Sequence, residues 1–526
     1  MINLIKKMFD NNEEFLSLTE ENLNEMKILL ENGADINSQD ENGFSALIMA
    51  TNKNNLDMVK FLLENGANIN LQDQFGWSAL IYATLSDNLE MVDFLLKNGA
   101  NINLQDTDGL SALIMAIETS YLEIVRLLCE NDANINLPDN NGASALMCAS
   151  NHNLEIVRLL LEKGANINSQ NDNGWSAIMF SSESGNLDIT KFLLENGADI
   201  NLKDNDGCSA LMHSSQYNNL EIVKFLLDNG LNIDSQKNDG ASALIIATDK
   251  GHLEIVKFLL ENGANINLQN NDGVSALIIA TNNNNFEIVR LLLENGADIN
   301  LRDNDGWSAL MIATNESNLE IVKFLLENGA NINLQDNDGW SALMYSSQHD
   351  NLEIVKLLCE NGADIHSQKN DGASALIIAT VKGHLEIVKF LLENGVNINL
   401  QDNDGWSALM IVSDHSNLEV TKFLIEKNAN INLQDNDGWS ALMYSSRHDN
   451  LEIVKLLCEN GANINLQDKD GFSALMIATD KGYLEIVKFL LENGANINLQ
   501  DNNGNSALSI AIGNNDSKIK RILEEA

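Results

Sequence analysis

Residues Asp303 to Gln335 have the sequence DNDGWSALMIATNESNLEIVKFLLENGANINLQ, and close copies of this segment fill most of the chain. The glycine of its turn, Gly306, has an equivalent in every copy. These fifteen glycines are Gly43, Gly76, Gly109, Gly142, Gly174, Gly207, Gly240, Gly273, Gly306, Gly339, Gly372, Gly405, Gly438, Gly471 and Gly504. They lie 33 residues apart, except for one interval of 32. A fixed period in this range predicts a stacked array whose units bury their apolar faces against their neighbours.

Each unit contains the signals of two helices. Ser308 precedes the apolar run 310–313, which is typical of a hydroxyl that caps the first N–H groups of a short helix. A second helix is predicted over 319–328, where Glu320, Lys323 and Glu327 are the charged residues. Their spacing of three and seven residues places them on one narrow stripe, so the rest of this helix is expected to be buried between neighbours.

The unit ends in an extended finger. Gly329 follows the second helix where a left-handed residue is favoured, and two units have Asp132 and Asn428 there, which tolerate the same conformation. Residues 331–335 then alternate between polar and apolar, and Asn-Asp-Gly at 337–339 is a hairpin signal. The predicted order is therefore helix, helix, β-finger.

This unit resembles the ankyrin repeat. The segments DNDG, SALMIAT, LEIVKFLL and GANIN correspond to that family's DxxG, TPLHxAA, LEIVKLLL and GADVN. One departure is systematic, since Ser-Ala-Leu followed by Met or Ile replaces Thr-Pro-Leu-His. The resemblance implies a mostly α fold, an ankyrin-type solenoid of helix-turn-helix-β-finger repeats stacked into a curved superhelical array. It also implies a non-catalytic scaffold that binds a protein partner through its concave groove and finger tips.

Three segments are predicted along the chain. Residues 1–42 form a degenerate N-terminal capping repeat, 43–503 form fourteen ankyrin-type repeats, and 504–526 form a C-terminal capping repeat. The last assignment rests on Lys520 and Glu524, which stand where other repeats have the Val and Leu that meet the next unit.

The first residues of the chain carry two further predictions. Thr19, Glu20 and Glu21 are expected to start the helix of the N-terminal repeat, and Met1–Phe9 to form a short amphipathic lid. A membrane anchor is the alternative for Met1–Phe9, but two lysines and few apolar residues favour the lid.

The formal net charge is −44, and it arises from the repeat itself, whose turn aspartates and helix glutamates outnumber its cations. Nucleic acids and anionic membranes need a basic surface, so neither is expected as a partner. The expected partner is a protein with a basic and apolar surface. The aspartates that favour it lie at the finger tips: Asp303, Asp305, Asp336, Asp338, Asp402, Asp404, Asp435 and Asp437.

The five cysteines show no pairing pattern, which is typical of a reducing compartment. They are Cys129, Cys148, Cys208, Cys359 and Cys458. The start of the chain, MINLIKKMF, does not have the order of a signal peptide, and there is no apolar run of the length of a membrane span. A cytoplasmic location is therefore expected.

No motif for chemistry stands out. The serines of GWSAL lack the second glycine of a nucleophile elbow, and the DNDG turns lack the first carboxylate and the final Glu of a calcium loop. Four histidines share one turn position, but repeats stacked about 10 Å apart hold them too far apart for a common zinc ion. They are His152, His349, His415 and His448. Exposed turn histidines are predicted instead, and no catalytic, cofactor-binding or metal-binding residue and no enzymatic activity is expected.

All six tryptophans directly follow a turn glycine, a position that the resemblance places on the concave groove. Large rigid aromatic residues there are typical binding anchors. The predicted partner-binding residues are Trp307, Trp340, Trp406 and Trp439, together with Trp77, Trp175, Tyr345 and Tyr444. The alternative for the tryptophans is a structural ladder between fingers. For the whole chain, which is expected to be a monomer, the alternative function is a self-assembling or passive elastic spacer.

Overall fold

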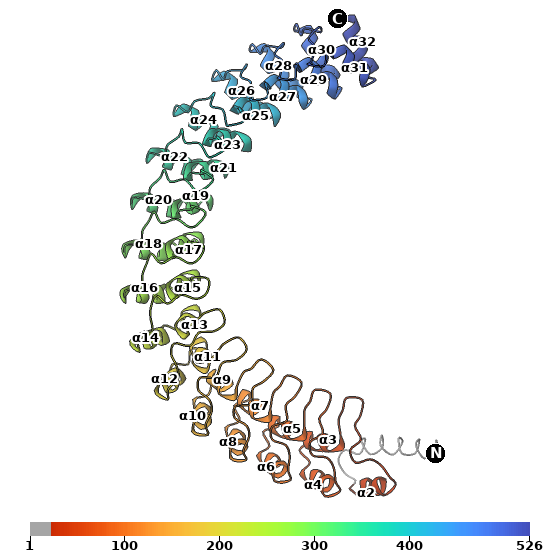
Figure 1. Ribbon diagram of the computed structural model, residues 1–526, viewed down its shortest axis with the longest axis vertical. Helices are drawn as coiled ribbons and strands as arrows, with labels where there is room; N and C mark the ends of the chain where they lie inside the picture. Colours follow the sequence, from red (N-terminus) through yellow and green to blue (C-terminus); the bar gives the residue numbers. More distant parts are fainter. Residues whose placement is uncertain (1–22) are drawn as a thin grey trace. The chain divides into compact units, whose positions relative to one another are not determined.

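The computed structural model describes residues 23–526, and these residues form helices joined by short turns and fingers (Figure 1). Contacts divide the chain into two units, of which unit 1 is described over 23–271 and unit 2 over 272–526. Each unit is a regular array of helix pairs, which confirms the predicted helical repeat architecture. The predicted lid at Met1–Phe9 and the cap at Thr19 to Glu21 lie outside the described residues.

Unit 1 starts with α2 (Leu23–Glu31) and continues with helix pairs. The first helices of its pairs are α3 (Ala46–Asn52), α5 (Ala79–Leu85), α7 (Ala112–Glu118), α9 (Ala145–Ser150), α11 (Ala177–Glu183), α13 (Ala210–Gln216) and α15 (Ala243–Asp249). The second helices are α4 (Leu56–Glu64), α6 (Leu89–Lys97), α8 (Leu122–Glu130), α10 (Leu154–Glu162), α12 (Leu187–Glu195), α14 (Leu220–Asp228) and α16 (Leu253–Glu261).

Unit 2 repeats the same arrangement. Its first helices are α17 (Ala276–Asn282), α19 (Ala309–Asn315), α21 (Ala342–Gln348), α23 (Ala375–Lys382), α25 (Ala408–Asp414), α27 (Ala441–Arg447), α29 (Ala474–Lys481) and α31 (Ala507–Gly513). The second helices are α18 (Phe286–Glu294), α20 (Leu319–Glu327), α22 (Leu352–Glu360), α24 (Leu385–Glu393), α26 (Leu418–Glu426), α28 (Leu451–Glu459), α30 (Leu484–Glu492) and α32 (Ser517–Glu525).

In most repeats the first helix is capped by the predicted serine and is almost wholly buried. Ser176 and Ser209 make no side-chain cap hydrogen bond, and only Ala507 and Ala511 of α31 are buried. Ser308 has extended backbone, and its Oγ accepts the N–H of Met311 at 3.4 Å. Every residue of α19 before its last is buried. A helix of seven residues is too short to be stable alone, so α19 depends on the helices that cover it.

The second helix is buried on one side only, as its charged stripe predicts. Ile321, Val322 and Leu325 are fully buried, whereas Glu320 and Lys323 are exposed. Lys323 Nζ lies 3.8 Å from a carboxylate oxygen of Glu353 in the next repeat. Other repeats form an ion pair along the second helix itself. These exposed pairs contribute little to stability.

The finger is closed by a single antiparallel bridge and by its aspartate. Gln335 and Ser341 form the bridge. The Oδ1 atom of Asp336 accepts the backbone N–H of Asp338 at 2.9 Å and that of Trp340 at 2.8 Å. The aspartate of the turn therefore holds the residue that follows the turn glycine in a fixed place at the base of the finger.

Neighbouring fingers are hydrogen-bonded to each other within each unit. The backbone N–H of Asn337 donates to the carbonyl of Asp305 at 2.9 Å, and its side chain donates to the carbonyl of Asn304 at 2.8 Å. The Gln335 amide donates to the carbonyl of Gln368 in the following finger at 3.0 Å. Residues at the base of successive fingers are thus held in one row.

In unit 2, successive first helices pack more closely than successive second helices. Closer spacing on one side bends a stack toward that side. The side of unit 2 that carries the first helices and the fingers is therefore concave (Figure 1). Unit 1, taken by itself, shows the same difference in packing between its first and second helices.

The one short interval lies in the turn between α9 and α10. Other repeats place a residue with positive φ in this turn, such as Asp350 at 56°, whereas Asn151 ends α9 with φ −71°. The residue missing from the 32-residue interval therefore falls in the interhelix turn.

The last repeat ends on a polar surface. In α32, Ile519 and Leu523 are buried against the preceding repeat, whereas Lys520 and Glu524 form an ion pair at 3.6 Å. In the preceding repeat, Val487 at the position of Lys520 is fully buried. This arrangement supports 504–526 as a capping repeat, and the division into 1–42, 43–503 and 504–526 is retained as a proposal.

We predict that deletion of residues 504–526 causes self-association, because it uncovers the apolar surface of α29 and α30. Light scattering on the purified protein measures it. A matched variant, Lys520→Val with Glu524→Leu, keeps α32 but restores the apolar residues of an internal repeat, and should associate as well. A truncated chain that stays monodisperse and as stable as the full chain contradicts the cap assignment.

We also predict that the two glycines of one repeat respond differently to alanine. Gly329 and Gly339 have φ of 83° and 86°, so either change strains the backbone by about 1 kcal/mol. A Cβ at Gly339 would lie 2.7 Å from the backbone N of Asn370 in the next finger, whereas one at Gly329 meets nothing within 4 Å. Gly339→Ala should therefore lose a further 1–3 kcal/mol, roughly the range for overpacking. Denaturant melts of both variants measure the difference, and equal losses would show that finger contact does not require glycine.

Candidate partner-binding surface

The residue after the turn glycine forms a row along the concave side of unit 2. The fingers place Trp307, Trp340, Trp406 and Trp439 in this row, and all four are partly buried. The remaining members are Val274, Ala373, Phe472 and Asn505. The indole rings therefore lie at the surface with part of each ring packed against the protein.

Two tryptophans of the row share one tyrosine of α21. The ring of Tyr345 lies 4.4 Å from that of Trp307 and 5.1 Å from that of Trp340, with which it is stacked. The Tyr345 hydroxyl donates to the Oδ2 atom of Asp336 at 2.5 Å, and only 7% of the residue is exposed. Burial and this hydrogen bond raise the pKa of Tyr345, so it is held neutral.

The same trio recurs three repeats further on. Tyr444 of α27 lies 4.3 Å from Trp406 and 5.2 Å from Trp439, and its hydroxyl donates to Asp435. Tyr444 is 4% exposed. Because Tyr345 and Tyr444 are both buried, they support the tryptophans from below and do not themselves offer an exposed ring to a partner.

This geometry agrees in part with each interpretation of the tryptophans, as binding anchors for a partner and as a structural ladder between fingers. One side of each ring packs on tyrosine or isoleucine, as in a ladder, and the remainder is accessible. Within residues 272–526, no hydrogen bond is formed by the indole N–H of Trp307, Trp340, Trp406 or Trp439. These donors are available to a partner. Their role in binding stays a prediction.

The tryptophans of unit 1 pack with other aromatic residues. Trp77 packs edge-on against Tyr82 at 5.3 Å, and its indole N–H donates to Asp106 at 3.2 Å. Trp175 packs against Phe180 at 5.2 Å and against His213 at 4.1 Å. Neither shares its aromatic partner with a second tryptophan, so the Trp–Tyr–Trp trios of the described residues lie on unit 2.

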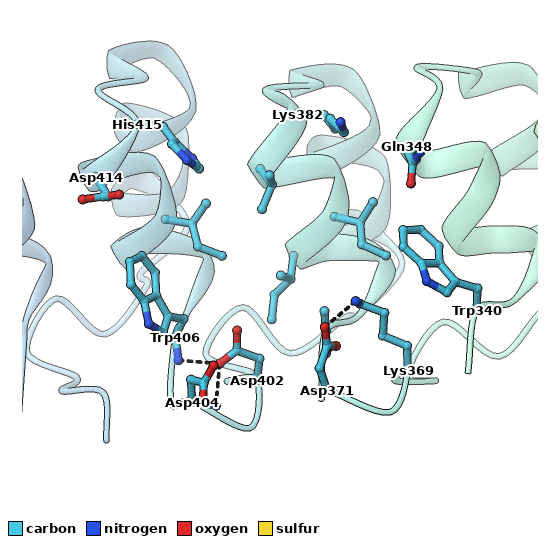
Figure 2. A pocket seen from close by; sticks show the side chains of 15 residues that line it. Trp340, Gln348, Lys369, Asp371, Lys382, Asp402, Asp404, Trp406, Asp414 and His415 are labelled. Atoms are coloured by element: carbon cyan, nitrogen blue, oxygen red, sulfur yellow. Dashed lines mark hydrogen bonds and ion pairs between the residues drawn. The ribbon is translucent and has the colours of Figure 1, made fainter. Parts of the chain in front are cut away.

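Ala373 interrupts the row of unit 2 between Trp340 and Trp406. Its small side chain leaves an open slot of about 610 Å³ between the two indoles (Figure 2). The floor is apolar and is made by Ala373, Ile377, Ile378 and Ile411. Sequence reasoning missed this slot, although an alanine at a position that has tryptophan in both adjacent repeats is the signal that could have found it.

Charged residues surround the slot. Lys369 and Asp371 form an ion pair on one finger, and Lys369 Nζ lies 5.1 Å from the centre of the Trp340 ring. Asp402 and Asp404 lie on the next finger (Figure 2). Burial raises the pKa of Asp402 above its ordinary value. The finger side of the slot is therefore acidic.

The turn histidines are exposed, as predicted. His448 Nε2 lies 2.8 Å from Asp414, and His349 Nε2 lies 3.0 Å from Asn315. Each of these pairs joins two successive repeats.

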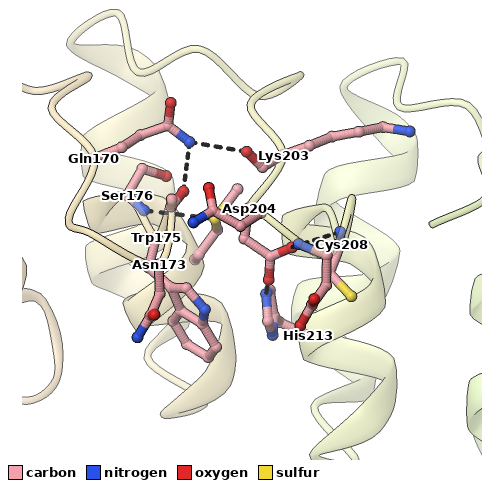
Figure 3. Close-up of polar contacts among 12 residues, drawn as sticks. Gln170, Asn173, Trp175, Ser176, Lys203, Asp204, Cys208 and His213 are labelled. Atoms are coloured by element: carbon pink, nitrogen blue, oxygen red, sulfur yellow. Dashed lines mark hydrogen bonds and ion pairs between the residues drawn. The ribbon is translucent and has the colours of Figure 1, made fainter. Parts of the chain in front are cut away.

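One group of potential metal ligands occurs among residues 23–526, and sequence reasoning missed it. Asp204, Cys208 and His213 have ligand atoms within 4.8 Å of one another (Figure 3). His213 Nε2 lies 3.0 Å from Asp204 Oδ2, and the other carboxylate oxygen accepts the N–H groups of Asp206 and Cys208. His213 occupies the repeat position of Tyr345 and replaces its bond to the turn aspartate. The bond between His213 and Asp204 thus follows the pattern of the repeat.

The cysteine thiols are poor nucleophiles. Burial raises the pKa of Cys129, Cys208, Cys359 and Cys458 to about 11 and that of Cys148 to about 12. All five are free thiols. At neutral pH the reactive thiolate is therefore scarce.

Comparison with known proteins identifies the family. The family model described as ankyrin repeats (3 copies) matches overlapping segments that cover 16–526: 16–106, 98–171, 136–204, 178–270, 244–336, 277–369, 328–402, 376–468 and 460–526. The chain belongs to the ankyrin repeat family, whose repeats are generally non-catalytic protein-interaction modules. A search of curated proteins gave no significant match.

None of the helices described over residues 23–526 combines the length and the apolar character needed to cross a bilayer.

We predict that unit 1 loses stability near His213 as pH falls below the ordinary histidine pKa of 6.5. Burial lowers the pKa of His213, although Asp204, Glu183 and Asp206 oppose this effect. His213 therefore binds a proton more readily in the unfolded chain than in the folded chain, so lowering the pH favours unfolding. Hydrogen exchange of α13 at about pH 7.5 and 5.5 measures the loss of protection.

Two variants control this experiment. His213→Tyr places the residue found at Tyr82 and Tyr345 beside Asp204 and should abolish the pH dependence. Exposed His448→Asn should leave it intact. Protection of α13 that is unchanged or greater at the lower pH contradicts the prediction.

Proposed function

We propose that this chain is a non-catalytic ankyrin-repeat scaffold that binds a protein partner through the concave side and finger tips of unit 2. The partner contacts Trp307, Trp340, Trp406 and Trp439. The observation that carries this proposal is the pair of Trp–Tyr–Trp trios, which hold four indole rings partly exposed in one row. Tryptophan is among the residues that contribute most to binding at protein interfaces.

The support beneath the rings favours binding. Tyr345 and Tyr444 are buried and hydrogen-bonded to aspartates, so the tryptophans above them have little freedom to lose when a partner binds. Preorganised side chains of this kind lower the entropy cost of association. In this proposal the two tyrosines position the anchors, while Trp77 and Trp175 make secondary contacts on unit 1.

The charge of the finger tips selects the partner. The aspartates beside the tryptophans favour a basic and apolar protein surface, and the net charge of −44 disfavours nucleic acids and anionic membranes. We infer that the protein acts as a monomer in the cytoplasm. Its five free thiols support the reducing environment of that compartment. The competing function is a self-assembling or passive elastic spacer.

Affinity capture followed by binding measurements on the purified partner tests this function. The four-residue variant in which Trp307, Trp340, Trp406 and Trp439 become Ala should lose the partner, and raising the salt concentration should slow association with the wild type. Leu89→Ala, which changes an exposed residue of α6, is the control and should bind normally. Equal partner affinity of wild type and four-residue variant, or concentration-dependent assembly without any partner, contradicts the proposal.

The single variants Trp340→Ala and Trp439→Ala separate anchors from a ladder. If the rings bind the partner, affinity should fall by about 2 kcal/mol for each, and the unfolding midpoint should move little. If the rings serve mainly to pack the fingers, each change should cost roughly 3–5 kcal/mol of stability, as for a buried aromatic residue. Denaturant melts of the two variants, beside their partner affinities, decide between these outcomes.

A further inference from the structure

We propose that the slot over Ala373 receives a basic, apolar segment of the protein partner. In this complex a large apolar side chain packs on Ala373 between Trp340 and Trp406, and a lysine or arginine beside it pairs with Asp402 and Asp404. This inference rests on the proposed function and specifies which part of the concave side takes the partner's central residues.

The size of the slot matches a segment of chain. Trp340 and Trp406 lie two repeats apart. Because stacked repeats are spaced by about 10 Å, the two indoles are roughly 20 Å apart, and the free width of the slot is this distance less the width of the rings. A helix with its side chains is about 10–12 Å across. The opening of about 610 Å³ therefore fits one helical turn or a few extended residues, and is too wide for one ring to touch both walls.

The lining of the slot favours an apolar side chain. Ala373, Ile377 and Ile411 pack into one cluster, and the ring of Trp406 lies against it. Val381, at the edge of the slot, is 45% exposed, which is unusual for a large apolar residue of this chain. A partner side chain placed here would bury apolar surface that the unit leaves open to water.

The charges around the slot set the orientation of the segment. Lys369 neutralises Asp371, and Arg447 and His448 lie 3.3 and 2.8 Å from Asp414. Within the described chain, Asp402 and Asp404 have no ion-pair partner, and the Oδ1 atom of Asp402 accepts the backbone N–H groups of Asp404 and Trp406. A cation from the partner would complete this finger side of the slot, where an acidic group would be repelled. Lys382 lines the opposite side of the slot and makes that side positive (Figure 2).

Unit 1 contains a natural comparison site. The sequence KNDGASALIIAT occurs at 237–248 as well as at 369–380, with Ala241 in the place of Ala373. Lys237 and Asp239 form the same ion pair as Lys369 and Asp371. The preceding repeat, however, has Cys208 where unit 2 has Trp340, so the wall of the slot is missing. Ala241 is therefore a matched control for Ala373.

The test uses three fluorescein-labelled peptides of about twelve residues with the full-length protein. The first peptide carries leucine and phenylalanine on one helical face and arginine on the other. The second has glutamate for arginine, and the third has alanine for leucine and phenylalanine. Fluorescence anisotropy should show the first peptide binding at least about tenfold more tightly than either of the others.

Substitutions then locate the bound peptide. Ala373→Trp fills the slot with the residue that adjacent repeats already have, and should weaken the first peptide by about tenfold or more. Ala241→Trp should have no effect. The double variant Asp402→Asn, Asp404→Asn should bind the first peptide more weakly, and its affinity should depend less on salt. Since asparagine has nearly the shape of aspartate, this variant tests the charge without altering packing. Thermal melts matching the wild type show that each variant is folded.

The outcomes separate this inference from the proposed function. A wild type that does not distinguish the three peptides, or an Ala373→Trp variant that binds the first peptide like the wild type, overturns the slot. If Ala373→Trp also leaves the purified partner bound while the tryptophan-to-alanine variants lose it, the proposed function stands and only the slot is wrong. If no tryptophan variant affects the partner, the proposed function itself fails.

Discussion

No repeat of this protein can bury its own apolar surface, and the structure depends on that constraint. The seven-residue helix α19 is buried along nearly its whole length, although α20 covers only part of its surface. The remaining cover comes from the first helices of the repeats before and after it. Each repeat is therefore stable only within a stack, and a polar surface such as that of Lys520 and Glu524 is needed where a stack ends.

The same constraint positions the candidate binding residues. Stacking brings each finger so close to the next that a Cβ at Gly339 would collide with the following backbone. Hydrogen bonds from Asn337 hold the fingers side by side, and Asp336 fixes Trp340 at the base of its finger. The row of tryptophans is consequently as regular as the helices behind it, and a partner would meet rings held at a fixed spacing.

Within this regular frame, a few side chains determine local chemistry. The turn aspartate pairs with Tyr345 in one repeat and with His213 in another. The same position of the repeat therefore forms this bond with side chains of different acidity. The finger of Ala373 keeps the backbone–backbone bonds of a tryptophan finger, but Lys369 replaces the turn aspartate and the N–H of Ala373 donates to Asp371 instead. The small side chain of Ala373 opens a slot with an apolar floor. The residue of the row can therefore differ from repeat to repeat while the backbone bonds between fingers are kept.

The sequence by itself determined the period, the two helices, the serine cap, the left-handed glycines and the polar C-terminal end, because these depend on neighbours within one repeat. It also indicated the tryptophan row, since register is conserved from copy to copy along this chain. Only the tertiary structure decided which side chains of successive repeats meet. Tyr345 between Trp307 and Trp340, Lys323 against Glu353, and the slot over Ala373 all join different repeats. Those contacts depend on the spacing and twist between stacked repeats, and the period of the sequence specifies neither.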